Sequence, residues 1–93
     1  MSIFTILNKK WAIDILRFIN NTSKSYSEIE KLVSNPRTTS SRLRDFEEKR
    51  ILIRQVQQDK HRSVKYSLTT LGLEILKKIN EIENLIKKDS NVR

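Results

Sequence analysis

Apolar residues recur every three or four positions between Ser2 and Asn21, a spacing that predicts one amphipathic helix. The polar segment 20–25 follows as a connector. Ser27 and Glu30 then have the Ser-x-x-Glu spacing of a capping box, in which each side chain bonds the backbone of the other residue. We therefore expect a second, short helix to begin at Ser27.

Asn35 and Pro36 predict the start of a third helix, over about residues 36–49, because asparagine is a favoured N-cap and proline is favoured at the first helical position. At about 100° per residue, three residues gather on the side expected to face the core: Thr39, Leu43 and Phe46. The residues expected on the exposed side are Arg37, Ser40, Ser41 and Arg44, with Thr38 at its edge.

The hydrophobic period changes to two between residues 51 and 68, which predicts a β-hairpin with the polar residues 58–63 as its loop. The alternating apolar residues are Ile51, Ile53 and Val56 in the first strand, and Val64, Tyr66 and Leu68 in the second.

Thr69 or Thr70 can cap the last helix, whose apolar stripe has spacings of three and four residues. The stripe consists of Leu71, Ile75, Ile79, Ile82 and Ile86. Residues 89–93 are mostly polar and are expected to form a frayed tail.

The expected order is therefore helix, helix, helix, two-stranded hairpin, helix. Two short helices joined by a tight turn, then a hairpin with a basic tip, describe a winged helix-turn-helix, a mainly α fold with a two-stranded β wing. In that fold the second helix of the pair enters the major groove of DNA, and the wing lies on the backbone or in the minor groove. A chain of 93 residues has room for one such domain, which we place at residues 1–88.

The composition favours an anionic partner. The chain has 19 Lys and Arg residues against 11 Asp and Glu residues, a net charge of +8, so double-stranded DNA is the leading candidate. It has no cysteine, one histidine and one glycine, so it lacks the residues of thiol catalysis, of the usual zinc sites and of glycine-rich phosphate loops. We expect no enzyme activity, no metal and no cofactor.

The apolar runs are only a few residues long, too short to cross a bilayer, and residues 1–10 lack the pattern of a signal peptide. We expect a cytoplasmic, nucleoid-associated protein without membrane contact. A chain of this size also gains stability from self-association, so a homodimer is expected.

Four segments together carry a family resemblance: KKWAIDILRFI, SYSEIEKLV, NPRTTSSRLRDFEEKRILIR and VKYSLTTLGLEIL. From about Ile6 to Leu76 the chain resembles the HxlR-type winged helix regulators, transcription factors related in architecture to MarR-type proteins. The resemblance implies a homodimeric DNA-binding repressor or activator, with residues 35–49 as recognition helix and dimerisation through the terminal helices. The residues on family positions are Pro36, Arg37, Arg42, Leu43, Arg54, Tyr66, Leu68, Thr69 and Gly72.

The chain departs from the family pattern at Arg50, where the family prefers glycine. Either the third helix ends differently, or Arg50 adopts a left-handed backbone conformation at a cost of about 1 kcal/mol. Some family members sense oxidants through a cysteine that this chain lacks, so thiol sensing is not implied.

The exposed side of the third helix is the first predicted DNA contact, through Arg37, Thr38, Ser40, Ser41 and Arg44. Arginine can read guanine, and serine or threonine can contact phosphates or bases; the alternative is an ordinary solvated helix face. The second predicted contact, on phosphates or in the minor groove, is made by Lys60, His61 and Arg62 in the hairpin loop. Its alternative is an ordinary exposed loop.

Apolar residues of the terminal helices are predicted to form the dimer interface: Ile3, Phe4, Leu7, Ile75, Ile79, Ile82 and Ile86. The alternative is burial of the last helix's stripe within one monomer. Trp11 is expected to pack in the core or the interface; otherwise it lines a pocket for an effector, which the sequence does not identify.

The function that best fits these patterns is sequence-specific transcriptional regulation by a homodimer. Two alternatives stay open. One is an architectural DNA-binding protein of weak sequence specificity, and the other is a winged helix module that binds other proteins.

Overall fold

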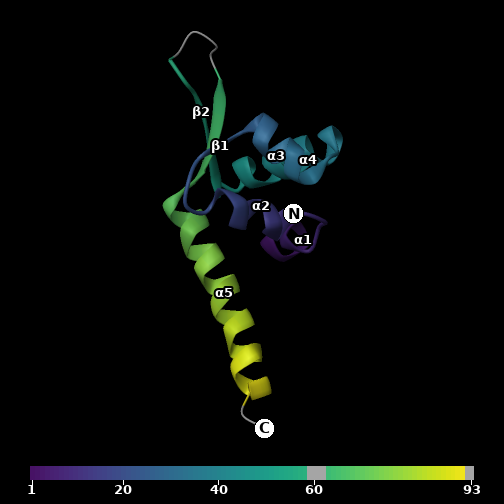
Figure 1. The fold of residues 1–93 in the computed structure, drawn as a ribbon, viewed down its shortest axis with the longest axis vertical. Helices are drawn as coiled ribbons and strands as arrows, with labels where there is room; N and C mark the ends of the chain where they lie inside the picture. Colours follow the sequence, from purple (N-terminus) through teal and green to yellow (C-terminus); the bar gives the residue numbers. More distant parts are fainter. Residues whose placement is uncertain (59–62, 92–93) are drawn as a thin grey trace.

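The computed structural model describes residues 1–58 and 63–91, which form five helices and a three-stranded sheet (Figure 1). The helices are α1 (Ile3–Leu7), α2 (Ala12–Ile19), α3 (Tyr26–Val33), α4 (Pro36–Glu48) and α5 (Thr70–Asn91). The strands are β1 (Lys24–Ser25), β2 (Leu52–Val56) and β3 (Val64–Leu68). The predicted winged helix-turn-helix is confirmed, with α3 and α4 as the helix pair and β2 and β3 as the wing.

The core lies where α2, α3 and α4 meet the inner end of the wing and the start of α5. Its most deeply buried large side chains are Ile15, Leu16, Ile19, Ile29, Phe46, Ile51 and Leu76. The rest of α5 extends away from this body, so the molecule measures 56 × 23 × 23 Å (Figure 1).

The single helix predicted over residues 2–21 is wrong, because the structure divides this segment into α1 and α2. Trp11 precedes α2 with a φ of 70°, in the left-handed region, and its side chain packs against the core. Lys9 in the same turn forms a 3.1 Å ion pair with Asp45 of α4. The apolar spacing continues across the turn, so the hydrophobic pattern does not reveal it.

The N-cap of α3 lies two residues earlier than predicted. Ser25, rather than Ser27, forms the capping box: Ser25 Oγ accepts from Glu28 N, and Glu28 Oε1 accepts from Ser25 N, both at 3.1 Å. Ser25 and Ser27 both begin a Ser-x-x-Glu sequence. Strand pairing decides between them, because Lys24 and Ser25 form β1 against β3.

The segment expected to be a connector therefore supplies a third strand. β3 is the middle strand and is antiparallel to both β1 and β2. The expected alternation in the first strand is also wrong, because Leu52 is buried and Ile53 is 46% exposed. Ile51 precedes β2 and is buried at the end of the turn that follows α4. Its inward side chain therefore does not determine which residues of β2 face the core.

Arg50 ends the turn after α4 with a φ of 60°, which is the left-handed alternative. Thr69 caps α5, since its Oγ1 accepts from Gly72 N at 3.0 Å and also donates to Arg50 O at 2.6 Å. The helix α5 continues to Asn91, so it includes part of the predicted tail.

Candidate nucleic-acid interface

The predicted recognition helix is present as α4, and its first turn is fixed by local chemistry. Asn35 Oδ1 accepts from Thr38 N at 3.0 Å, and Pro36 occupies the first turn. The three residues expected to face the core are buried: Thr39, Leu43 and Phe46. Their burial leaves the opposite side of α4 at the surface.

The predicted DNA contacts on α4 lie on that outer side, although they are not equally free. Arg37 and Arg44 are exposed, whereas Thr38, Ser40 and Ser41 are half-buried. The guanidinium of Arg42 donates to Ser41 Oγ at 3.4 Å. The two arginines are thus the side chains best able to reach beyond the helix surface.

Tyr26 ties α3 to the start of α4. Its hydroxyl donates to Pro36 O at 3.2 Å and lies 2.9 Å from Ser40 Oγ. Ser40 therefore has a partner within the protein, and its most evident role is to fix the angle between the two helices. Arg42, one of the residues on family positions, donates from Nε to Lys10 O at 2.8 Å in the turn before α2.

The predicted wing contacts Lys60, His61 and Arg62 lie outside the described residues. In the described part of the wing, Arg54 is an exposed cation on β2.

A polar cavity of about 230 Å³ lies between α4 and the sheet. Its lining residues are Tyr26, Ser40, Leu43, Arg44, Glu47, Arg54 and Tyr66. From the sequence, Arg54 was placed on a family position but was not assigned a role, and Glu47 was not assigned a role either. The pairing of Arg54 in β2 with Tyr66 in β3 brings Arg54 close to α4. No local sequence pattern indicates this position of Arg54.

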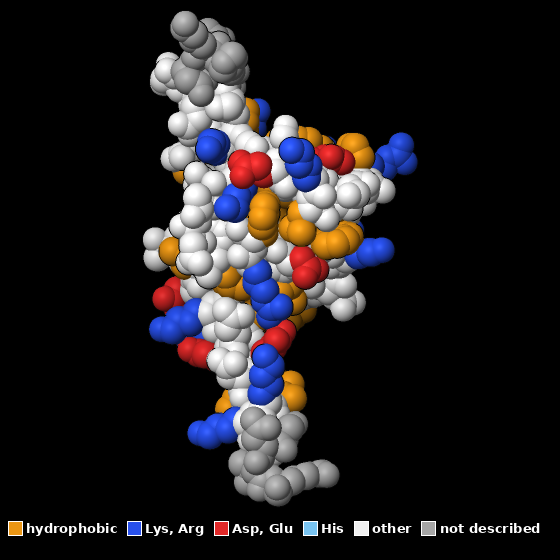
Figure 2. Space-filling view, viewed as in Figure 1, with side chains coloured by type: hydrophobic (Ala, Val, Ile, Leu, Met, Phe, Trp, Pro, Cys, Tyr) orange, Lys and Arg blue, Asp and Glu red, His pale blue; other side chains and the backbone are white. Residues whose placement is uncertain are grey.

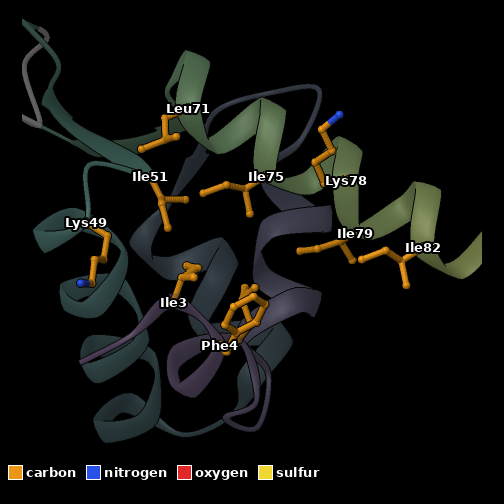
Figure 3. Close-up of a pocket in the computed structure, with 10 residues that line it drawn as sticks. Ile3, Phe4, Lys49, Ile51, Leu71, Ile75, Lys78, Ile79 and Ile82 are labelled. Atoms are coloured by element: carbon orange, nitrogen blue, oxygen red, sulfur yellow. The ribbon is translucent and has the colours of Figure 1, made fainter.

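Both groups of residues predicted for the dimer interface meet in one apolar groove of about 410 Å³ (Figure 3). The groove runs between α1, the end of α4 and α5, and the predicted residues that line it are Ile3, Phe4, Leu7, Ile75, Ile79 and Ile82. Phe4 is 79% exposed and Ile82 is 59% exposed. Ile86 is also exposed, farther along α5.

Charged side chains are spread over the face of the molecule that Figure 2 shows. Figure 2 shows Lys and Arg side chains over α3 and α4 and along α5, with Asp and Glu side chains between them. Within residues 1–58 and 63–91, no group of three or more His, Asp or Glu side chains is placed to hold a metal ion. No helix in this part of the chain is both long and apolar enough to cross a membrane.

Comparison with known proteins identifies the family. The family model described as HxlR-like helix-turn-helix matches residues 6–92. The chain belongs to the HxlR-like helix-turn-helix family. A search of curated proteins found no match to this HxlR-like chain.

Solved structures share the fold of this HxlR-like protein. The reduced form of the transcriptional regulator YodB from B. subtilis is 25% identical, with a TM-score of 0.79 over 87% of this chain and 81% of that one. A MarR-family regulator from Porphyromonas gingivalis W83 is also 25% identical, with a TM-score of 0.75 over the same shares of the two chains. A MepR mutant from S. aureus, bound to an oligodeoxyribonucleotide, is 18% identical, with a TM-score of 0.81 over 96% of this chain and 70% of that one.

Proposed function

We propose that this HxlR-like protein is a homodimeric, sequence-specific DNA-binding transcriptional regulator. The observation that supports this most is α4, a capped helix of 13 residues with one side anchored in the core and Arg37 and Arg44 on the other. In this proposal, residues 36–49 enter the major groove, and the wing at residues 58–63 lies on the backbone or in the minor groove. The MepR mutant, which has the same fold, is bound to an oligodeoxyribonucleotide in its structure.

The electrostatics of α4 favour DNA at its N-terminal half. Its first turn has no acidic residue, and the helix dipole adds partial positive charge there. The acidic residues of α4 are Asp45, Glu47 and Glu48, all in its last turns. Lys9 pairs with Asp45, which reduces the negative charge at that end.

The groove between α1 and α5 supports the dimer. Contiguous exposed apolar surface is costly in water, and a second copy of the chain would cover it. A two-fold dimer would present two recognition helices to successive major grooves, about 34 Å apart, and would read a pseudo-palindrome.

Selection of bound sequences from a random duplex pool tests the proposal. We expect a palindromic consensus with half-sites one helical turn apart. A consensus without symmetry would contradict the dimeric arrangement. Salt-dependent binding without any enrichment would identify an architectural DNA-binding protein, and absence of a salt-dependent DNA shift would favour a protein-interaction module.

A further inference from the structure

We propose that the polar cavity between α4 and the sheet is a binding site for one phosphate of the DNA backbone, in which Arg54 binds the phosphate and Glu47 positions Arg54. The inference rests on the DNA binding proposed above. It adds a contact outside the recognition helix and the wing tip.

The strand register places Arg54 on the side of the sheet that faces α4. Arg54 of β2 is paired with Tyr66 of β3, and residues directly opposite in an antiparallel pair project from the same face. Tyr66 is only 7% exposed, so this face is the inner one. Arg54 lies on β2, at the edge of the sheet, and is itself exposed. Its guanidinium therefore borders the cavity and is open to solvent.

Glu47 reaches the same cavity from α4. Its Oε1 atom is buried and accepts no hydrogen bond from the residues that the structure describes. A buried carboxylate oxygen without a donor is costly, so it is best explained by a cation that approaches it in another state of the protein.

Among the described residues, the side chains of two cations line the cavity, Arg44 and Arg54. Arg44 belongs to α4, as Glu47 does, and is proposed to read bases, whereas Arg54 reaches the cavity from β2. The hydroxyls of Tyr26 and Ser40, which also line the cavity, already bond to each other at 2.9 Å. Arg54 is thus the cation that we assign to Glu47.

Arginine is suited to bridge two anions. The planar guanidinium has five N–H donors, so one edge can donate to a carboxylate while the other donates to phosphate oxygens. A Glu47 that holds one edge restricts the side-chain rotamers of Arg54 before DNA arrives, which reduces the entropy lost on binding. When α4 lies in a major groove and the wing on the adjoining backbone, a DNA strand passes between them, close to this cavity.

The proposal predicts whether removal of the charge on Glu47 strengthens or weakens DNA binding. Without a positioning role, Glu47 would repel the phosphate, and its neutralisation would tighten DNA binding. With that role, neutralisation weakens binding, because Arg54 loses its anchor. The effect of Glu47 must then depend on Arg54.

The test measures affinity of the full chain for a random-sequence duplex as a function of salt. The variants are Arg54→Ala, Glu47→Gln, the double variant and Arg54→Lys, with thermal unfolding recorded for each. We expect Arg54→Ala to weaken binding several-fold and to reduce the slope of log K against log salt by about 0.9, the value for one lost phosphate contact. Glu47→Gln should also weaken binding, but not in the Arg54→Ala background.

Arg54→Lys should keep most of the salt slope but lose the dependence on Glu47, because an ammonium lacks the second planar edge. The control is Gln55→Ala, which changes an exposed residue on the other face of the same strand and should bind as wild type does. Tighter binding by Glu47→Gln, or an equal effect of Glu47→Gln with and without Arg54, would overturn the site. A wild-type chain that shows no salt-dependent binding would overturn the proposed function itself, whereas normal binding by all variants would overturn only the site.

Discussion

Arg37 and Arg44 project from the same side of α4, about two helical turns apart. Neighbouring serines are partly engaged by protein groups, so these arginines are the residues expected to read base edges. Arg37→Ala and Arg44→Ala should each weaken binding to the selected sequence by about 1–3 kcal/mol. Competition between selected and random duplexes measures this loss, with Lys77→Ala on exposed α5 as the control. An equal loss on both duplexes would reassign the arginine to a phosphate contact.

Arg50 has a backbone conformation that favours glycine. Its φ is 60°, while the adjacent Lys49 has a φ of −89°. Arg50→Gly should therefore raise the free energy of unfolding, by up to about 1 kcal/mol, less the entropy that glycine adds to the unfolded chain. Lys49→Gly has no such strain to relieve and should be destabilising. Chemical denaturation at one protein concentration compares the two, and a loss of stability in Arg50→Gly would show that the turn does not favour glycine.

At the scale of elements, the start of α3 depends on Ser25. Its hydroxyl satisfies the amide of Glu28, and Ser27 makes no capping bond. Ser25→Ala should cost about 1 kcal/mol of stability. Ser27→Ala is the matched control and should cost much less, because Ser27 lies within the first turn of the helix. Equal losses in thermal unfolding would contradict the observed capping box.

The same capping box predicts a pH dependence. The backbone and side-chain hydrogen bonds with Ser25, together with nearby Lys24 and Lys65, lower the pKa of Glu28 below its ordinary value of 4.5. A lowered pKa means that the charged form stabilises the fold above the unfolded value, and that this stability is lost as pH falls through the folded value. Wild type should thus exceed Glu28→Gln in stability at pH 7, and the difference should shrink below about pH 4.5. A constant difference across this range would contradict the role of the charge.

The sequence predicted elements whose signals are local. Asn35 and Pro36 determine the start of α4 within one turn, so these two residues were sufficient to predict where the helix begins. The turn at Trp11 and the strand β1 were missed, because each depends on contacts with residues far along the chain, namely Asp45 for the turn and β3 for the strand. Ser25 and Ser27 could not be distinguished locally, since both fit the same motif.

The candidate site follows the same rule. The exposed side of α4 was predicted from helical periodicity, and its two arginines are exposed. The cavity shared by Glu47 and Arg54 was not, because these residues belong to different elements and meet only when β2 pairs with β3. Hydrophobic periodicity describes one helix or strand at a time, so it does not predict a site that is formed between two elements.

At the scale of the whole molecule, the apolar groove adjoins α4, the proposed recognition helix. Lys49 and Ile51, directly after α4, line the groove together with α1 and α5 (Figure 3). The turn after α1 is also joined to α4, through Lys9 and Asp45. A partner seated in the groove would therefore contact the elements that hold α4, so dimerisation and the orientation of the recognition helix are expected to be linked.

This arrangement makes the dimer testable on α5 alone. Ile82 faces the groove and is 59% exposed, whereas Leu73 is 45% exposed on the opposite side of the helix. Ile82→Asp should bury a charge in the interface and give monomers in analytical ultracentrifugation, with weakened binding to a palindrome and little change on a single half-site. Leu73→Asp introduces the same charge away from the groove and should remain dimeric. A dimeric Ile82→Asp would move the interface elsewhere, and monomers from both variants would point instead to damage of α5, because only a groove-specific effect separates the two sides of this helix.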